Sequence, residues 1–314
     1  MAKGDAGLWS VTIGPIQPEL YGYFFDVDGV TVLDPSNPQV KQHLSRNMSA
    51  LLVPGKESDL YAVKGVPHGT LSIVWYPSPT LGMARRMSVY TPPGYEDSAT
   101  AKYPVLYLLH GAGGNEEARP QLGVAPAILD NLMSQGQATP MVVVMPNGEA
   151  EQAGKRGETP PAVRRDSPPG DRRASSARFE ESLIKDIIPY IEMHYRVLAD
   201  KNHRAMAGYS MGGAQTQQIA LSNPTLFAYI GVFGAGVRRP SEDLETQYAD
   251  LKSKNPKLYW VGVGQEDTEF RGVQTLVALL KKNQFYYTYR EIAWGHNFAS
   301  WRIYFSELAP LLFK

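Results

Sequence analysis

Residues 204–216 read RAMAGYSMGGAQT, and within them Gly208-Tyr209-Ser210-Met211-Gly212 forms a G-x-S-x-G sequence. The short apolar run before the motif predicts a strand, and the residues after Gly212 predict a helix. In that context the serine sits on a sharp, strained turn that exposes its hydroxyl at the edge of a sheet. Glycine suits the positions two residues either side of it, because a side chain there would collide with neighbouring backbone. The stretch therefore predicts a nucleophilic Ser210.

The sequence around this motif alternates apolar, strand-like runs with amphipathic helices. Near-continuous apolar strands separated by helices predict a mostly parallel sheet covered on both faces, which binds ligands outside the carboxyl ends of its strands. Together with the serine motif, this pattern predicts an α/β-hydrolase fold. The expected strands are 70–76, 86–91, 105–110, 141–146, 204–208, 228–233, 258–264 and 285–292, and the expected helices are 125–135, 179–195, one after Gly212, 273–282 and 301–312.

A serine hydroxyl needs a base to remove its proton, and a histidine is a common choice. His296 is the best candidate, because it lies between the last predicted strand and the last predicted helix and would reach the same sheet edge as Ser210. Trp294 and Phe298 flank it and are candidates for contacting a ligand. Four other histidines are interpreted as structural or solvated, namely His43, His68, His194 and His203.

A third residue must orient the imidazole and stabilise its cation, and a carboxylate can do so. Because α/β-hydrolases place the acid between the serine and the histidine in the chain, the search is confined to residues 211–295. The strand predicted at 258–264 runs into Gln265-Glu266-Asp267-Thr268-Glu269. Asp267 is the preferred acid, and the spacing alone leaves Glu266 and Glu269 open as alternatives.

Acyl transfer also needs donors for the oxyanion that develops on the attacked carbonyl. One donor is expected from the backbone N–H that follows the nucleophile, at Met211. The other is expected from the loop after an early strand, His110-Gly111-Ala112-Gly113-Gly114, where Ala112 is the best candidate. The same loop does not fit the G-x-G-x-x-G spacing of a dinucleotide site.

The 314 residues include 31 basic and 31 acidic side chains and no cysteine. Zero net charge disfavours a nucleic-acid partner, because phosphate binding needs a basic surface. The lack of cysteine excludes thiol nucleophiles, disulfides and zinc-thiolate sites. No phosphate loop and no metal-ligand spacing such as H-E-x-x-H is present, so we expect no cofactor and no metal. No apolar run has the length of a membrane span or a signal peptide, and the compartment stays undetermined.

The first 60 residues differ in pattern from the rest. Short alternating runs between Trp9 and Val32, with Asp28-Gly29 between two of them, predict strands and a hairpin. Residues 39–60 read as a polar linker. We therefore expect a small β-module and linker at 1–60 and a catalytic domain at 61–314. Residues 149–176, rich in Pro, Gly and charged side chains, predict a long solvated loop that could also wall the active site.

Five stretches match the motifs of a known family: LLHGAGGN (108–115), VVVMPNG (142–148), LIKDIIPYIEMHYRVLADKNHRAMAGYSMGGAQT (183–216), VGVGQED (261–267) and WGHNFASWRIYFSELAPLLF (294–313). The chain from about Thr70 to Lys314 thereby resembles carbohydrate esterase family 1 and the related esterase D group. The resemblance implies a serine esterase most like the bacterial feruloyl esterases, with acetylxylan and siderophore-lactone esterases as the alternative. It also favours Asp267 as the acid and a secreted or periplasmic enzyme whose leader has been removed, with a cytoplasmic one as the alternative.

Residues 9–38 are similar to the back half of the immunoglobulin-like module that precedes such esterases and is related to starch- and glycogen-binding domains. The first strands of that module are missing, which makes it a partial β-sandwich and leaves an open edge that could pair with a second chain in a homodimer. The expected partner at the site is a small-molecule or polysaccharide-linked ester. A noncatalytic carbohydrate-binding protein is the hypothesis from another class, and a broken triad would be its sign.

Overall fold

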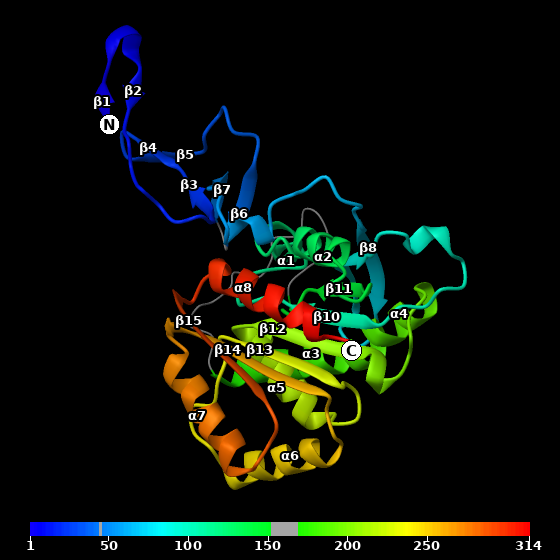
Figure 1. The fold of residues 1–314 in the computed structure, drawn as a ribbon. Helices are drawn as coiled ribbons and strands as arrows, with labels where there is room; N and C mark the ends of the chain where they lie inside the picture. Colours follow the sequence, from blue (N-terminus) through cyan, green and yellow to red (C-terminus); the bar gives the residue numbers. More distant parts are fainter. Residues whose placement is uncertain (44–45, 152–168) are drawn as a thin grey trace.

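The computed structural model describes residues 1–43, 46–151 and 169–314, and its centre is an eight-stranded sheet (Figure 1). The strand order across the sheet is β15-β14-β13-β12-β10-β11-β9-β8. The six strands from β15 to β11 are parallel, whereas β9 pairs antiparallel with β11 and β8 pairs antiparallel with β9. The strands are β8 (Thr70–Ser78), β9 (Met83–Thr91), β10 (Val105–Leu109), β11 (Val142–Pro146), β12 (Arg204–Tyr209), β13 (Tyr229–Phe233), β14 (Leu258–Glu266) and β15 (Thr288–Gly295).

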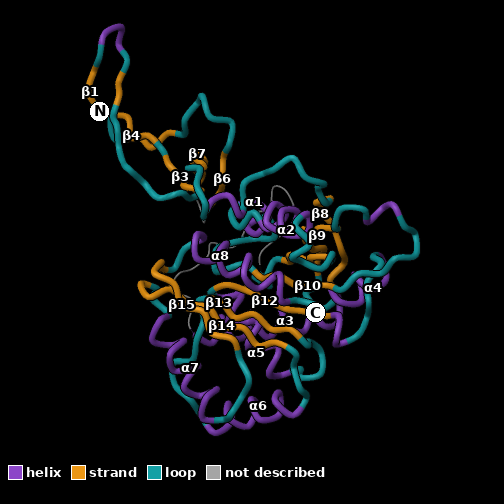
Figure 2. Tube along the Cα trace, viewed as in Figure 1, coloured by secondary structure: helices purple, strands orange, loops and turns teal. Residues whose placement is uncertain are grey.

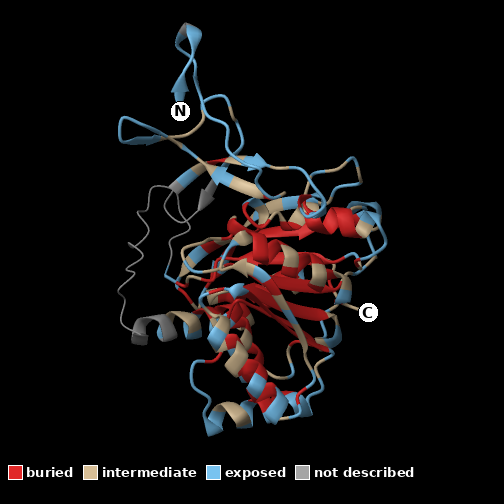
Figure 3. Cartoon of the chain, turned by 60° about the vertical axis from the view of Figure 1, so that its left-hand side comes forward, coloured by how far each residue is buried: buried red, intermediate tan, exposed pale blue. Residues whose placement is uncertain are grey.

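Helices cover both faces of this sheet, as the alternating pattern predicts (Figures 1 and 2). On one face α2 (Ala125–Ser134) and α8 (Phe298–Leu308) bury their apolar sides in a core cluster that contains Leu106, Val143 and Trp301. The other face is covered by α5 (Met211–Ser222), α6 (Glu242–Ser253), α7 (Phe270–Lys282), α3 (Pro169–Ser182) and α4 (Ile188–His194). The central strands β10 to β13 are buried throughout, because side chains on both of their faces meet a helix layer (Figure 3).

Several predicted boundaries are corrected by the structure. The helix expected at 179–195 is two α-helices, α3 and α4, joined by a π-helical turn at Leu183–Ile187. Because α3 begins at Pro169, the prediction of a loop through residue 176 is wrong for its last part, and the rest of that loop, 152–168, lies outside the described residues. The last helix begins at Phe298 rather than 301, since the Asn297 side chain caps it by accepting a hydrogen bond from the Ser300 amide at 3.1 Å.

The first 52 residues form three small sheets beside the α1 and α8 end of the large sheet (Figure 1). The predicted hairpin is confirmed, because Asp28 and Gly29 both have positive φ and join two paired strands. The linker expected at 39–60 is wrong for residues 40–52, where two strands pair with each other and one of them pairs with β3. These strands are β1 (Ala2–Lys3), β2 (Trp9–Ser10), β3 (Leu20–Tyr23), β4 (Phe25–Val27), β5 (Val30–Val32), β6 (Val40–His43) and β7 (Arg46–Leu52).

The error over residues 40–52 has a physical reason. The segment is polar enough to read as a linker, yet its backbone groups are satisfied by long-range pairing, such as Leu20 with Leu52. Ser49 is fully buried there, and its hydroxyl accepts a hydrogen bond from the Asp34 amide at 2.9 Å. The division into a module at 1–60 and a catalytic domain at 61–314 stays a prediction. Within the described residues, no helix combines the length and the apolar character that crossing a bilayer requires.

Candidate active site

Ser210 lies in a tight turn between β12 and α5, at the carboxyl edge of the large sheet. Its φ is 57° and its ψ is −118°, a conformation that non-glycine residues rarely adopt. A hydrogen bond of 2.8 Å from its amide to the Phe233 carbonyl holds the turn against β13. A Cβ on Gly208 would lie 2.3 Å from the Gly212 carbonyl oxygen, and one on Gly212 would lie 2.5 Å from the His110 carbonyl oxygen. The turn therefore requires both glycines of the motif.

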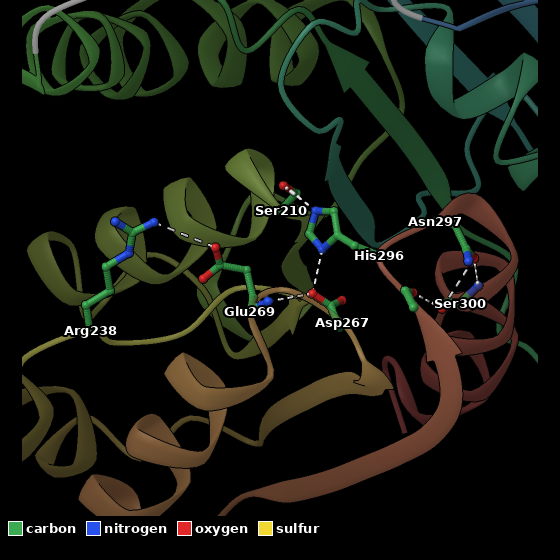
Figure 4. A network of polar contacts seen from close by, with 8 residues as sticks. Ser210, Arg238, Asp267, Glu269, His296, Asn297 and Ser300 are labelled. Atoms are coloured by element: carbon green, nitrogen blue, oxygen red, sulfur yellow. Dashed lines mark hydrogen bonds and ion pairs between the residues drawn. The ribbon is translucent and has the colours of Figure 1, made fainter. Parts of the chain in front are cut away.

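The side chains of Ser210, His296 and Asp267 are joined by two hydrogen bonds (Figure 4). His296 Nε2 is 2.8 Å from Ser210 Oγ, and His296 Nδ1 is 2.7 Å from Asp267 Oδ1. A carboxylate can only accept, so Nδ1 carries the ring proton and Nε2 is left to accept the serine proton. The Asp267 side chain has no exposed surface, whereas 27% of the His296 side chain is exposed. The imidazole thus has a buried carboxylate behind it and an open edge at the serine.

Asp267 is held at the end of β14 by its own backbone and by that of the following turn. Its amide donates to the Gly264 carbonyl at 3.1 Å, and its Oδ1 also accepts from the Glu269 amide at 2.7 Å. The two alternative acids lie elsewhere: Glu266 is exposed, and the Glu269 carboxylate faces Arg238 at 3.9 Å (Figure 4). Of the three carboxylates left open by spacing, the structure brings Asp267 to the histidine.

His296 follows β15 and precedes α8, so both elements fix its position. Ser300 Oγ donates to the Gly295 carbonyl at 2.7 Å and ties the turn to the first residues of α8. The Tyr209 ring lies against the imidazole, with ring centroids 4.6 Å apart. These contacts restrict the ring to the orientation in which its two nitrogens face Ser210 and Asp267.

The loop that contains Ala112 lies directly beside Ser210. A Cβ on Gly111 would be 3.5 Å from the Ser210 Cβ, so the backbone of this loop runs within contact distance of the nucleophile. Met211 is the first residue of α5, and the first amides of a helix have no partner within it. The structure therefore brings the two predicted oxyanion donors, Met211 and Ala112, to the same side of Ser210 as the cavity described below.

His110 opens this loop and is buried. Its Nε2 accepts a hydrogen bond from the Gly148 amide at 2.9 Å, so Nδ1 must carry the proton that it shares with the Gly111 carbonyl at 2.8 Å. Burial lowers the pKa of His110 from 6.5 to about 4, and the ring is neutral at pH 7. Gly148 in turn accepts from the Gln215 side chain at 3.0 Å, which links the loop to α5. His110 is a rigid tie between loops.

A cavity of about 360 Å³ opens in front of Ser210 and His296. Its walls are the loop 111–115, the residues around the short helix α1 (Ala118–Gln121), and Phe298. Of the two aromatic residues expected to meet a ligand, Phe298 lines the cavity and Trp294 is not among its lining residues. Gln121 and Leu122 line it although the sequence did not single them out, because a four-residue helix has no apolar periodicity to reveal it.

The arrangement suits nucleophilic acyl transfer. A carbonyl group placed in the cavity would meet a serine hydroxyl already hydrogen-bonded to a basic nitrogen, with free backbone amides on the same side. A metal-dependent alternative finds no ligand set in the chain described, since no three His, Asp or Glu side chains gather there as metal ligands.

Comparisons with known proteins agree with this geometry. The chain is 32% identical over 323 residues to an endo-1,4-beta-xylanase/feruloyl esterase of Xylanibacter ruminicola; the match covers 100% of this chain and 41% of that protein. A CE1 ferulic acid esterase of Anaeromyces mucronatus is 26% identical, with a TM-score of 0.68 and coverage of 81% of this chain and 95% of that one.

The enterobactin esterase of Shigella flexneri has the same fold, with 20% identity, a TM-score of 0.65, and coverage of 90% of this chain and 69% of that one. The α/β-hydrolase fold and the resemblance to carbohydrate esterase family 1 are confirmed by these matches. The family model for esterases matches residues 78–310, a range that contains Ser210, Asp267 and His296. The chain therefore belongs to the esterase family.

Proposed function

We propose that the protein is a serine carboxylesterase that hydrolyses hydroxycinnamoyl esters, above all feruloyl esters, of plant cell-wall polysaccharide. The observation that carries the proposal is the hydrogen-bonded series Ser210–His296–Asp267 at the mouth of a cavity of about 360 Å³. That volume lies in the range of sites that bury small ligands, and the cavity is larger than an acetyl group needs. The relatives named above, whose own activities include feruloyl ester hydrolysis, support the choice of acyl group.

The proposed reaction has two halves. Ser210 Oγ attacks the ester carbonyl while His296 Nε2 takes its proton, and the oxyanion forms next to the Met211 and Ala112 amides. The C–O bond to the sugar then breaks, His296 returns the proton to the departing alcohol, and a feruloyl ester of Ser210 remains. In the second half, water attacks this acyl-enzyme, His296 takes and returns its proton, and ferulic acid leaves. Asp267 stays ionised throughout and holds the imidazole.

An ester panel tests the proposed substrate. We expect kcat/KM for methyl ferulate to exceed those for a small acetyl ester, for acetylated xylan and for a catecholate trilactone. Ser210→Ala should remove the activity, and Ser222→Ala, at the exposed end of the same helix α5, should leave it unchanged. A trilactone or an acetyl ester as the best substrate would instead make the protein a siderophore or acetyl esterase, and wild-type activity in Ser210→Ala would overturn the mechanism.

The remaining predictions follow from the same proposal. Feruloylated polysaccharide lies outside the cells that degrade it, so we propose a secreted or periplasmic enzyme. The homodimer through the N-terminal β-module also stays a proposal: light scattering at high protein concentration should give twice the 34.7 kDa mass of one chain, and a monomer would refute it.

A further inference from the structure

A buried ion pair joins the N-terminal strands to the last helix. Arg302 on α8 places Nη2 2.5 Å from Oε1 of Glu19, the residue before β3, and the two side chains are only 2% and 7% exposed. A buried ion pair adds little net stability, because the cost of desolvating both charges offsets their attraction. Its larger consequence is geometric, since each charged group holds specific atoms in place.

The Arg302 guanidinium also binds the wall of the cavity. Its Nη1 donates to the Leu122 carbonyl at 2.5 Å, and its Nη2 donates to the Leu20 carbonyl at 3.3 Å. Leu122 lines the cavity in front of Ser210. One guanidinium therefore connects the N-terminal strands to a residue that contacts the space for the acyl group.

A second arginine holds the same wall from the opposite side. Arg119 on α1 is buried, its Nε donates to the Leu109 carbonyl at 2.8 Å, and its guanidinium lies 4.2 Å from the centre of the Trp301 ring. Trp301 packs directly on the backbone at Gly123, where a Cβ would lie 2.0 Å from the ring. The wall formed by residues 118–123 is thus fixed to the oxyanion loop by Arg119 and to the N-terminal strands by Arg302.

We propose that Glu19 and Arg302 are positioning residues for the acyl pocket, so that the N-terminal β-strands control how the enzyme discriminates between large and small acyl groups. Without its carboxylate partner, the guanidinium can no longer hold the Leu122 carbonyl in place, and the wall loses its fixed distance from Ser210. A feruloyl group long enough to reach Leu122 depends on that distance, whereas an acetyl group is too short to depend on it. The choice of feruloyl as the large acyl group rests on the function proposed above.

The test compares two substrates in three variants. Glu19→Gln removes one charge, Arg302→Lys keeps the charge but loses the second nitrogen, and the double variant Glu19→Met with Arg302→Leu removes both charges and should keep the fold. We expect the ratio of kcat/KM for methyl ferulate to that for 4-nitrophenyl acetate to fall about 10-fold in Glu19→Gln and in the double variant, mainly through KM for the ferulate. Glu57→Gln, an exposed glutamate of the same segment, should leave the ratio unchanged.

A merely structural pair gives a different result. If both substrates lose activity in equal proportion, or if the ratio stays at the wild-type value while thermal melts show folded protein, the proposal is overturned. Failure of the feruloyl assignment would be recognised separately, because the wild type would then not hydrolyse methyl ferulate. The same ratio would in that case be measured with 4-nitrophenyl octanoate as the long acyl ester, and it must fall in the same variants.

Discussion

The loops after β10 and β15 each bring a histidine to the same edge of the sheet, but the two rings have opposite surroundings. His110 is buried, and its ring nitrogens bond to backbone groups of Gly111 and Gly148. His296 is partly exposed, and its nitrogens face the side chains of Asp267 and Ser210. The difference shows that burial and the type of partner, rather than residue type or distance from the serine, determine which histidine can take up a proton.

The comparison would be broken most clearly by the loss of His296. His296→Ala should lower kcat for methyl ferulate by about 10⁶-fold, since the serine would lose its base while the cavity stays intact. Steady-state kinetics measure the loss, and His203→Ala, at an exposed histidine paired with Asp200, serves as the matched control. A loss of less than about 100-fold would mean that another group deprotonates Ser210.

The carboxylate behind His296 should matter almost as much. Asp267→Asn should lower kcat by about 10⁴-fold, because an amide in this place no longer fixes the proton on Nδ1. Glu266→Gln and Glu269→Gln should each stay within about twofold of the wild type, since neither carboxylate reaches the imidazole. An equal loss in all three variants would remove the distinction between Asp267 and the alternative acids.

The buried histidine should reveal itself through stability rather than turnover. The pKa of His110 is about 4 in the folded protein, against 6.5 for an ordinary histidine. Between those values the unfolded chain binds more protons, so the stability contribution is fully present above pH 6.5 and is lost as the pH falls toward 4, by about 3 kcal/mol at most. Urea unfolding at pH 7 and pH 4.5 should show this loss in the wild type but a smaller one in His110→Gln. Equal losses in the two proteins would contradict a buried neutral ring.

The aromatic residues on either side of His296 should differ least. Phe298 lines the cavity and Trp294 is not among its lining residues, so Phe298→Ala should raise KM for methyl ferulate by up to about 10-fold, and Trp294→Ala should change it by less than twofold. Both variants should keep kcat within a few-fold, because neither ring touches the reacting atoms. A larger KM effect at Trp294 would place the substrate on the wrong side of the histidine.

The sequence was enough to predict the residues at the sheet edge because their signals are local. Ser210 lies in a five-residue motif, and Asp267 and His296 each follow directly after an apolar run that forms a strand. In a parallel sheet such positions meet at one edge, so their nearness follows from the order of elements. His110 stood in the same kind of position, and only its burial in the folded protein separates its role from that of His296.

The cavity wall and its supports could not be predicted in the same way. Gln121 and Leu122 belong to a short helix and the turn after it, without a periodic pattern. Glu19 and Arg302 are separated by 283 residues, and a pairing over that distance depends on tertiary packing. The strands β6 and β7 were mistaken for a linker for a similar reason, since their stability comes from pairing with β3 rather than from an apolar sequence.

The central claim is that Ser210 carries the acyl group between the two halves of the reaction. The direct measurement mixes the protein with 4-nitrophenyl ferulate and follows nitrophenol release before steady state, then maps the acid-quenched protein by peptide mass. We predict a burst of about one nitrophenol per active site and a feruloyl mass added to the peptide that contains Ser210, with neither seen in Ser210→Ala. An adduct on another residue, or wild-type hydrolysis by Ser210→Ala, would contradict the account.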